Sequence, residues 1–207
     1  MKTADTVQDR ILERFRRKGP GSVLTAREFQ DLGNGQAVRQ ALSRSAKSGL
    51  LLKVARGFYT VPRIDSDLGA LAPPLDSVVN ALKARDGIRL LPSGAHSANL
   101  LGLSTQVPVR LVFLTDGPTR RIRLGKREIV FKRTTPRQMA TADRISGTVI
   151  QALRWLGRAQ VNDKVVNHLR KRLDARAKRE LLRDARHAPA WVGEVLRRIA
   201  SDDRSRS

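Results

Sequence analysis

The clearest structural signal in the N-terminal part of the chain is Leu50-Leu51-Leu52-Lys53-Val54-Ala55-Arg56-Gly57-Phe58-Tyr59-Thr60-Val61-Pro62. Two β-prone runs flank Arg56-Gly57, and a glycine-containing pair between two such runs is typical of a hairpin turn. Pro62 closes the second run, because proline cannot donate a hydrogen bond to a sheet ladder. The stretch therefore predicts a β-hairpin.

Three segments with helix signals precede this hairpin. Residues 3–17 carry apolar side chains at helical spacing and end before a Gly-Pro-Gly sequence. Thr25, with Glu28 three residues later, forms the capping box of a second, short helix. After a turn, residues 36–48 form a third amphipathic helix that ends at a glycine. With a short extended piece before Thr25, this order predicts a winged helix-turn-helix domain over residues 1–62.

The rest of the chain divides by pattern into a linker and a second domain. Residues 63–74 are rich in Asp, Gly and Pro and predict a linker. Residues 75–140 mix helical and strand-like segments, and residues 141–200 are helical only. We therefore expect an α+β fold, in which a C-terminal domain over residues 75–207 is mixed α/β to about residue 140 and helical beyond it.

Composition indicates a polyanionic partner. The 207 residues include 41 Lys and Arg against 19 Asp and Glu, which gives a net charge of +22 spread along the chain. Nucleic acid is the leading partner, ahead of an anionic membrane or an acidic protein. The charged N-terminus predicts no secretory signal, no apolar run approaches the roughly 18 residues of a membrane helix, and cysteine is absent. We expect a cytoplasmic protein with no membrane partner.

The helix over residues 36–48 has the polar face that a recognition helix needs. Its N-terminal part normally reads bases, so we expect Gln36, Arg39 and Gln40 to contact base edges in the major groove. Arg44 and Lys47 are expected to contact phosphates. The complete predicted DNA interface is Gln36, Arg39, Gln40, Ser43, Arg44 and Lys47 on the helix, with Lys53 and Arg56 on the wing.

A second basic surface is a further candidate for nucleic-acid contact. Basic and apolar residues alternate between residues 120 and 127, which predicts a half-buried strand with a basic outer face. Residues 170–180 form a strongly basic helical segment, in which Arg176 and Glu180 are spaced for an i, i+4 ion pair on a solvated face. The candidate residues are Arg120, Arg121, Arg123, Lys126, Arg127, Arg170, Lys171 and Arg172.

The sequence predicts no catalytic residues, no cofactor and no metal. It contains no phosphate-binding G-x-x-x-x-G-K-[ST] loop, and the three histidines are too far apart in sequence for a ligand pair. The sequence Asp65-Ser66-Asp67 could hold magnesium, but its place in a linker favours solvated carboxylates. We therefore expect a protein that is not an enzyme.

Two motifs resemble a known family. Leu52-Lys53-Val54-Ala55-Arg56-Gly57-Phe58-Tyr59 is similar to the wing of the AbiEi-type antitoxins of type IV toxin–antitoxin systems. Residues 93–104, SGAHSANLLGLS, followed by Gln106-Val107-Pro108, resemble the start of that family's C-terminal antitoxin domain. The resemblance covers roughly residues 5–135 and leaves the helical segment beyond residue 140 unassigned.

The resemblance implies an antitoxin that represses its own operon. Its winged helix would bind duplex DNA at its own promoter, and its C-terminal domain would oppose a cognate nucleotidyltransferase-like toxin. Such antitoxins are thought to oppose the toxin's effect, so direct contact with the toxin stays open, as does the oligomeric state. The alternatives are an ordinary winged-helix transcriptional regulator that senses a ligand, and a basic RNA- or ribosome-binding protein.

Overall fold

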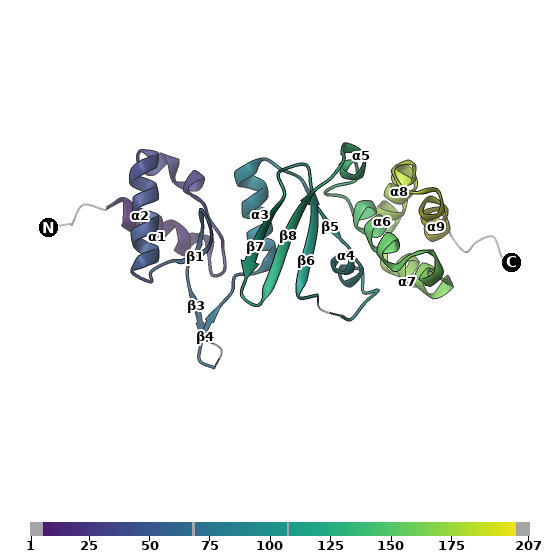
Figure 1. Ribbon diagram of the computed structural model, residues 1–207, viewed down its shortest axis with the longest axis horizontal. Helices are drawn as coiled ribbons and strands as arrows, with labels where there is room; N and C mark the ends of the chain where they lie inside the picture. Colours follow the sequence, from purple (N-terminus) through teal and green to yellow (C-terminus); the bar gives the residue numbers. More distant parts are fainter. Residues whose placement is uncertain (1–5, 68, 107, 202–207) are drawn as a thin grey trace. The chain divides into compact units, whose positions relative to one another are not determined.

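The computed structural model describes residues 6–67, 69–106 and 108–201, and it has the predicted α+β architecture. The chain divides into two compact units (Figure 1). The first unit comprises Met1–Ile88 and Ile122–Glu128, and the second comprises Arg89–Arg121 and Ile129–Ser207.

Three helical segments in the first unit match the predicted ones. Helix α1 (Val7–Lys18) is capped by Thr6 and Asp9, so residues 3–5 of the predicted helix lie outside the described residues. Thr25 and Glu28 form the expected capping box, but the segment they open, η1 (Ala26–Leu32), is a 3-10 helix kinked at Phe29. Helix α2 (Gly35–Lys47) packs its apolar face on both. The side chains of this small core include Ile11, Phe15, Phe29, Val38, Leu42 and Leu51.

The predicted wing is present. Strands β1 (Leu52–Ala55) and β2 (Phe58–Thr60) pair antiparallel around Arg56-Gly57, where Gly57 adopts a φ of 80° that favours glycine. Leu24 bridges to Tyr59, which gives the extended piece expected before the second helical segment. The first unit therefore has the element order of a winged helix-turn-helix.

Residues 63–74, expected as a linker, contain a second hairpin instead. Strands β3 (Arg63–Asp65) and β4 (Gly69–Leu71) pair antiparallel, and the amide of Asp67 donates to Asp65 Oδ1 in the turn. Turn-forming residues therefore close a hairpin here. Helix α3 (Leu75–Asp86) follows and belongs to the first unit, although the sequence places the start of the second domain at residue 75.

A four-stranded sheet follows α3. Its strands are β5 (Leu90–Ser93), β6 (Arg110–Thr115), β7 (Arg120–Leu124) and β8 (Arg127–Arg133), in the order β5-β6-β8-β7. β5 and β6 pair antiparallel, with Leu90 opposite Thr115. The short helix α4 (Ala95–Leu100) lies between β5 and β6 in the sequence.

The C-terminal region is helical, as expected. Helices α5 (Pro136–Met139), α6 (Ile145–Leu156), α7 (Asp163–Arg172), α8 (Ala175–Asp184) and α9 (Ala190–Ala200) are joined by the 3-10 turns η2 (Arg158–Gln160) and η3 (Ala185–His187). α6 contacts β5, α4 and α8, and its apolar side chains form the core of the second unit with those of α7 and α9 (Figure 1). In the part of the chain that the structure describes, no helix has both the length and the apolar composition needed to span a membrane.

Asp184 joins α8 to the start of α6. Its carboxylate is fully buried and accepts hydrogen bonds from Arg144 Nη1 at 2.7 Å and from Ser146 Oγ at 2.6 Å. Burial alone would raise the pKa of Asp184, but the hydrogen bonds from Ser146 and Arg144 and the nearby positive charges outweigh it, so this pKa lies below its ordinary value. A carboxylate with a lowered pKa stabilises the fold above its unfolded pKa and loses this effect as the pH falls through its folded pKa.

Replacing Asp184 should therefore destabilise the second unit. We expect Asp184→Ala to lower the free energy of unfolding by about 3 kcal/mol at neutral pH, because Arg144 and Ser146 lose their buried partner. Asp163→Ala, which removes the exposed partner of Arg198, should cost under about 1 kcal/mol. Urea unfolding measures both changes, and equal losses would contradict a special role for the buried carboxylate. The difference between wild type and Asp184→Ala should shrink below about pH 4.

Gly147 allows the backbone of Thr141 and the side chain of Leu91 to lie close to the first turn of α6. A Cβ at this position would collide with the carbonyl oxygen of Thr141 and lie 2.8 Å from Leu91 Cδ1. Gly147→Ala should therefore lower the free energy of unfolding by about 1–3 kcal/mol, the range for an overpacked core. Gly193 in α9 is the matched control, because its nearest contact to an added Cβ is 3.4 Å and alanine favours helices. A similar loss for Gly193→Ala would show that the steric argument fails.

Candidate nucleic-acid interface

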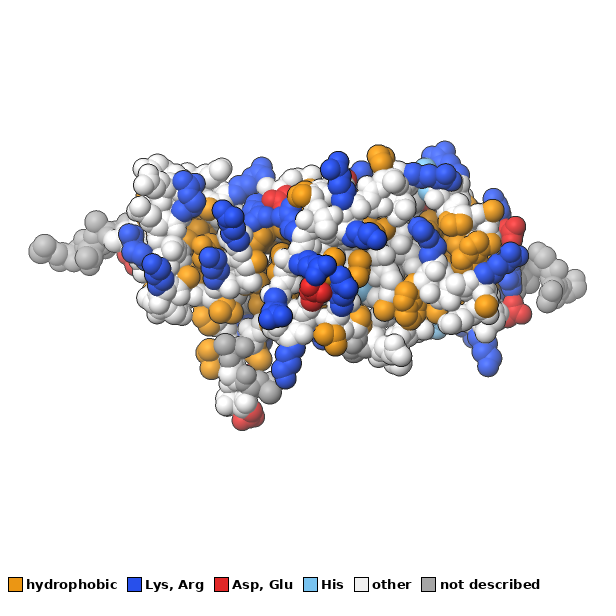
Figure 2. Space-filling view, viewed as in Figure 1, with side chains coloured by type: hydrophobic (Ala, Val, Ile, Leu, Met, Phe, Trp, Pro, Cys, Tyr) orange, Lys and Arg blue, Asp and Glu red, His pale blue; other side chains and the backbone are white. Residues whose placement is uncertain are grey.

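Helix α2 presents the predicted polar face to solvent. Asn34 caps the helix by accepting from the amide of Ala37 at 2.8 Å, and Val38, Ala41, Leu42 and Ser45 are buried on the inner side. The six residues predicted to contact DNA are all exposed: Gln36, Arg39, Gln40, Ser43, Arg44 and Lys47. Figure 2 shows blue Lys and Arg side chains over this helix.

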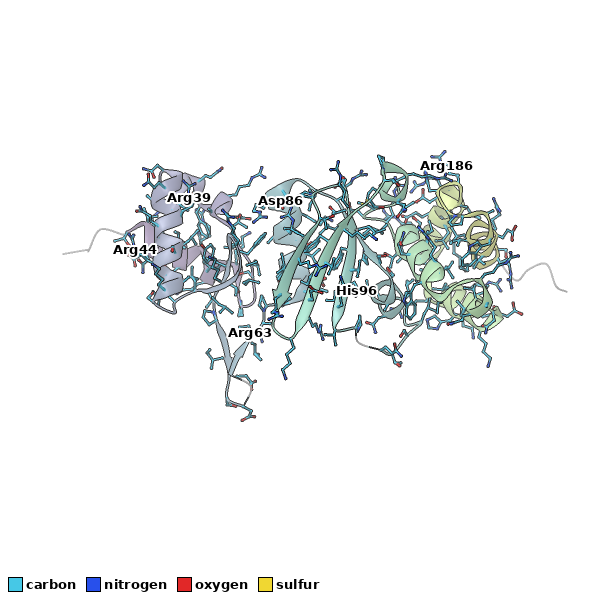
Figure 3. The ribbon with its side chains drawn as sticks, viewed as in Figure 1. Arg39, Arg44, Arg63, Asp86, His96 and Arg186 are labelled. Atoms are coloured by element: carbon cyan, nitrogen blue, oxygen red, sulfur yellow. The ribbon has the colours of Figure 1, made fainter. Side chains whose placement is uncertain are left out.

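These six side chains divide into a central row and two edges. At about 100° per residue, Gln36, Gln40, Ser43 and Lys47 fall within a narrow arc along the helix. Arg39 and Arg44 lie on opposite sides of that row, about 140° apart. Both arginines come from α2 in Figure 3, where they are labelled. The exposed face therefore combines polar side chains along its middle with a guanidinium on each flank.

Three carboxylates of this unit are held by partners outside α2. Asp9 accepts from Thr6, Glu28 accepts from Thr25, and Asp31 pairs with Arg14 at 2.6 Å. The side-chain hydrogen bond from Arg14 lowers the pKa of Asp31 to about 2. The sequence has no Asp or Glu between Asp31 and Asp65, and Arg39, Arg44 and Lys47 make no ion pair with any described residue. The cationic face of α2 is therefore available to an external anion.

The wing is held by the C-terminal turn of α3. The guanidinium of Arg85 lies 4.0 Å from the ring centroid of buried Phe58, and its Nη1 donates to the carbonyl oxygen of Arg56 at 3.1 Å. Arg27 also contacts this turn, donating to the carbonyl oxygens of Ala84 and Arg85. The predicted wing residues, Lys53 and Arg56, keep their side chains exposed. The contact of Arg85 fixes the hairpin that carries them.

The residues of the predicted second basic surface differ in their surroundings: most on the β7–β8 hairpin are exposed, and two on α7 bind backbone carbonyl oxygens. On the β7–β8 hairpin, Arg121, Arg123, Lys126 and Arg127 are exposed and Arg120 is half-buried, while Ile122 and Leu124 are buried as the alternation predicts. On α7, two arginines contact backbone carbonyl oxygens: Arg170 Nη2 donates to Arg198 at 2.7 Å, and Arg172 Nη2 donates to Leu100 at 3.2 Å. Lys171 is exposed. The structure therefore gives Arg170 and Arg172 a role in joining elements of the second unit.

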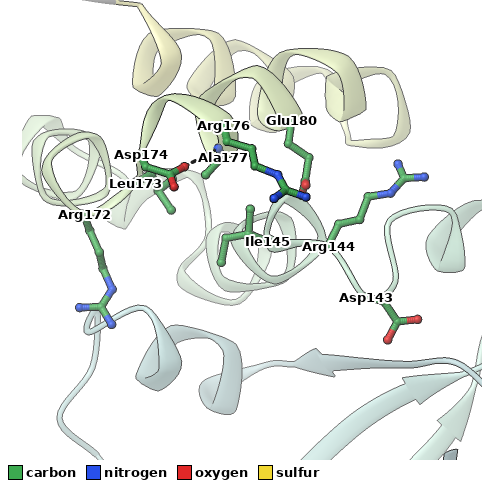
Figure 4. A pocket seen from close by; sticks show the side chains of 9 residues that line it. All are labelled: Asp143, Arg144, Ile145, Arg172, Leu173, Asp174, Arg176, Ala177 and Glu180. Atoms are coloured by element: carbon green, nitrogen blue, oxygen red, sulfur yellow. Dashed lines mark hydrogen bonds between the residues drawn. The ribbon is translucent and has the colours of Figure 1, made fainter.

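A hollow of about 370 Å³ lies beside the first turns of α6 and α8 (Figure 4). Cationic and anionic side chains alternate around it, with Ile145 and Leu173 between them. The lining residues are Asp143, Arg144, Ile145, Arg172, Leu173, Asp174, Arg176, Ala177 and Glu180. Such a lining suits a small polar molecule with both charges. Among the described residues, no group of three His, Asp or Glu side chains is arranged to hold a metal ion.

Sequence reasoning missed the residues that position the interface. Arg85 and Arg27 lie 29 and 57 residues from the backbone atoms they contact in Arg56 and Ala84. A single sequence carries no signal for such a pair. Asn34 is different, because an Asn directly before a helix is a common N-cap and is a local signal that the sequence does carry.

Removing the Arg85 guanidinium should loosen the wing. In Arg85→Gln, the cation–π contact with Phe58 is lost and the hydrogen bond to Arg56 is weakened, so amides of residues 53–60 should exchange with deuterium about five- to tenfold faster. Amides of α2 should be unaffected, because Arg85 does not contact that helix. Hydrogen–deuterium exchange of the full chain measures both, and unchanged exchange in the wing would contradict the proposed contact.

Comparison with known proteins identifies a family for this chain. No curated protein matches it. Among solved structures, the crystal structure of the RV2827C protein from Mycobacterium tuberculosis is 17% identical and covers 95% of this chain and 78% of that chain, with a TM-score of 0.48. A family model described as a family of unknown function matches residues 10–181, which is most of the chain. The chain therefore belongs to the DUF6088 family, whose function is unknown.

Proposed function

We propose that the first unit binds duplex DNA through α2, and that the protein is an antitoxin which represses its own operon. The observation that carries the DNA-binding part is the exposed face of α2, where arginine, lysine and glutamine side chains have no carboxylate partner among the described residues. A capped helix of 13 residues with a wing beside it fits the width of the DNA major groove.

The arrangement of α2 suggests separate roles for its amides and its arginines. Gln36 and Gln40 lie in the central row and near the N-terminal half of the helix, which is the part that normally reads bases. Arg39 and Arg44 lie on the two flanks, where a helix in the major groove faces the phosphates of opposite strands. This changes the role expected for Arg39, which the sequence alone suggested as a base contact.

The antitoxin part of the proposal rests on the resemblance to AbiEi-type antitoxins. The first motif forms the wing hairpin. The second begins at the end of β5, runs through α4 and continues past it to Pro108, with Val107 outside the described residues. The partner would be a nucleotidyltransferase-like toxin. The protein would oppose the effect of this toxin, with or without direct contact between the two proteins. Protection of cells that co-express such a toxin tests this part independently of DNA binding.

A second candidate function is a transcriptional regulator that senses a small molecule. The hollow beside α6 and α8 favours it, because three arginines and three carboxylates surround a volume suited to a small zwitterion. Its partner would be a ligand rather than a toxin. Release of promoter DNA on addition of amino acids or other zwitterionic metabolites, with no protection against a toxin, would favour this function over the antitoxin.

Two double variants separate base reading from phosphate contact. We expect the double variant Arg39→Ala, Arg44→Ala to bind all duplexes at least tenfold more weakly. The slope of log Kd against log salt concentration should fall by about 2, because two phosphate contacts are lost. Gln36→Ala with Gln40→Ala should reduce the preference for the promoter over a scrambled duplex while leaving that salt slope nearly unchanged. Fluorescence anisotropy titrations at several salt concentrations measure both quantities.

Arg17→Ala with Lys18→Ala is the matched control, because it removes two exposed cations from α1 in the same unit. This control should change the affinity and the slope much less than the arginine pair on α2. Equal effects of the two pairs would show that binding follows net charge alone and would overturn the placement of the recognition helix.

A further inference from the structure

Four arginines form one exposed stripe along α8 and η3. Arg176, Arg179, Arg183 and Arg186 follow one another at spacings of three or four residues, and all four are exposed. At about 100° per residue they fall within an arc of about 80°. Figure 3 shows Arg186 pointing away from the helices of the second unit. We call these four residues the arginine stripe.

The carboxylates nearest the stripe already have partners elsewhere. Glu180 is spaced for an i, i+4 pair with Arg176, but its Oε1 accepts from the amide of Ser146 at 3.0 Å instead. Asp184 is fully buried against Arg144 and Ser146, and Asp174 accepts from the amide of Ala177 at 2.7 Å. The ion pair that the sequence suggested between Arg176 and Glu180 is therefore not formed, and Arg176 is exposed without that partner.

The four guanidinium groups differ in how far they are engaged. Arg176 and Arg179 make no ion pair within the described part of the chain. Arg183 lies 3.4 Å from the buried Asp184 with most of its side chain exposed, and Arg186 Nε donates to His187 Nε2 at 3.3 Å. In contrast, Arg170 and Arg172 donate to backbone carbonyl oxygens. Of the three basic residues that the sequence selected on α7, Lys171 alone keeps an exposed side chain with no partner among the described residues, and the arginines of α8 and η3 extend this basic surface.

We infer that the arginine stripe is a second nucleic-acid surface, which contacts a phosphodiester backbone. Guanidinium groups bind phosphate oxygens through two donors at once, and the stripe contains no amide side chain with which to read bases. At about 1.5 Å per residue, the ten-residue step from Arg176 to Arg186 spans about 15 Å, which is long enough to reach more than one phosphate of a backbone. Arg176 also lines the hollow beside α6, so the stripe begins at a surface recess.

Neutralising the stripe tests this inference in the full-length protein. The variant carries Arg176→Gln, Arg179→Gln, Arg183→Gln and Arg186→Gln, and the control carries Arg154→Gln, Arg158→Gln, Lys164→Gln and Arg197→Gln, which are exposed residues of the same unit. The probes are a 20-base-pair DNA duplex of mixed sequence and an RNA duplex of the same sequence. Circular dichroism and thermal unfolding show first that both variants are folded.

We expect the stripe variant to lose at least tenfold in affinity for one of the two probes near 50 mM salt, and its salt slope to fall by about 3. The control variant should lose less than threefold. A loss on DNA assigns the stripe to a DNA ligand, and a loss on RNA alone assigns it to an RNA ligand. Equal effects of variant and control, or no effect on either probe, would overturn the inference. Because α2 is intact throughout, this result is independent of the Arg39 and Arg44 experiment.

Discussion

The structure depends on where a small number of carboxylates are placed among many cationic side chains. With 19 acidic and 41 basic side chains, the chain cannot pair most of its positive charges. The carboxylates described above are instead used at helix ends and between elements: Asp9 and Glu28 cap, Glu180 and Asp184 hold α6 to α8, and Asp31 pairs with Arg14. These sites stabilise the fold, and among the described residues Arg39, Arg44, Lys47, Arg176 and Arg179 are left without an ion pair.

This constraint connects the two surfaces that we assign to nucleic acid. On α2, no acidic residue is close in sequence, so the face is cationic by composition. On α8, acidic residues are present, and the fold turns them inward, so the arginine stripe is cationic by geometry. Two surfaces in two compact units could contact one nucleic acid or two different ones.

The sequence predicted the elements with local signals and missed those that depend on distant contacts. The capping box at Thr25, the Arg56-Gly57 turn and the buried side of α2 follow from short-range patterns, and the structure has all three. The hairpin at residues 63–71 was missed because its Asp and Gly residues also suit a linker. The contact of Arg85 with the wing and the inward turn of Glu180 depend on packing between segments far apart in the sequence, which periodicity and spacing cannot show.

Sequence-specific DNA binding by α2 is tested most directly by a salt titration of binding to the DNA upstream of the protein's own gene. A scrambled duplex and an RNA of matched sequence serve as competitors. We expect a large preference for the upstream DNA that persists at about 150 mM salt, because base contacts from α2 do not depend on counterion release. Equal binding to all three, lost together as salt rises, would contradict sequence-specific binding by α2 and would leave the charge of +22 as a general polyanion surface.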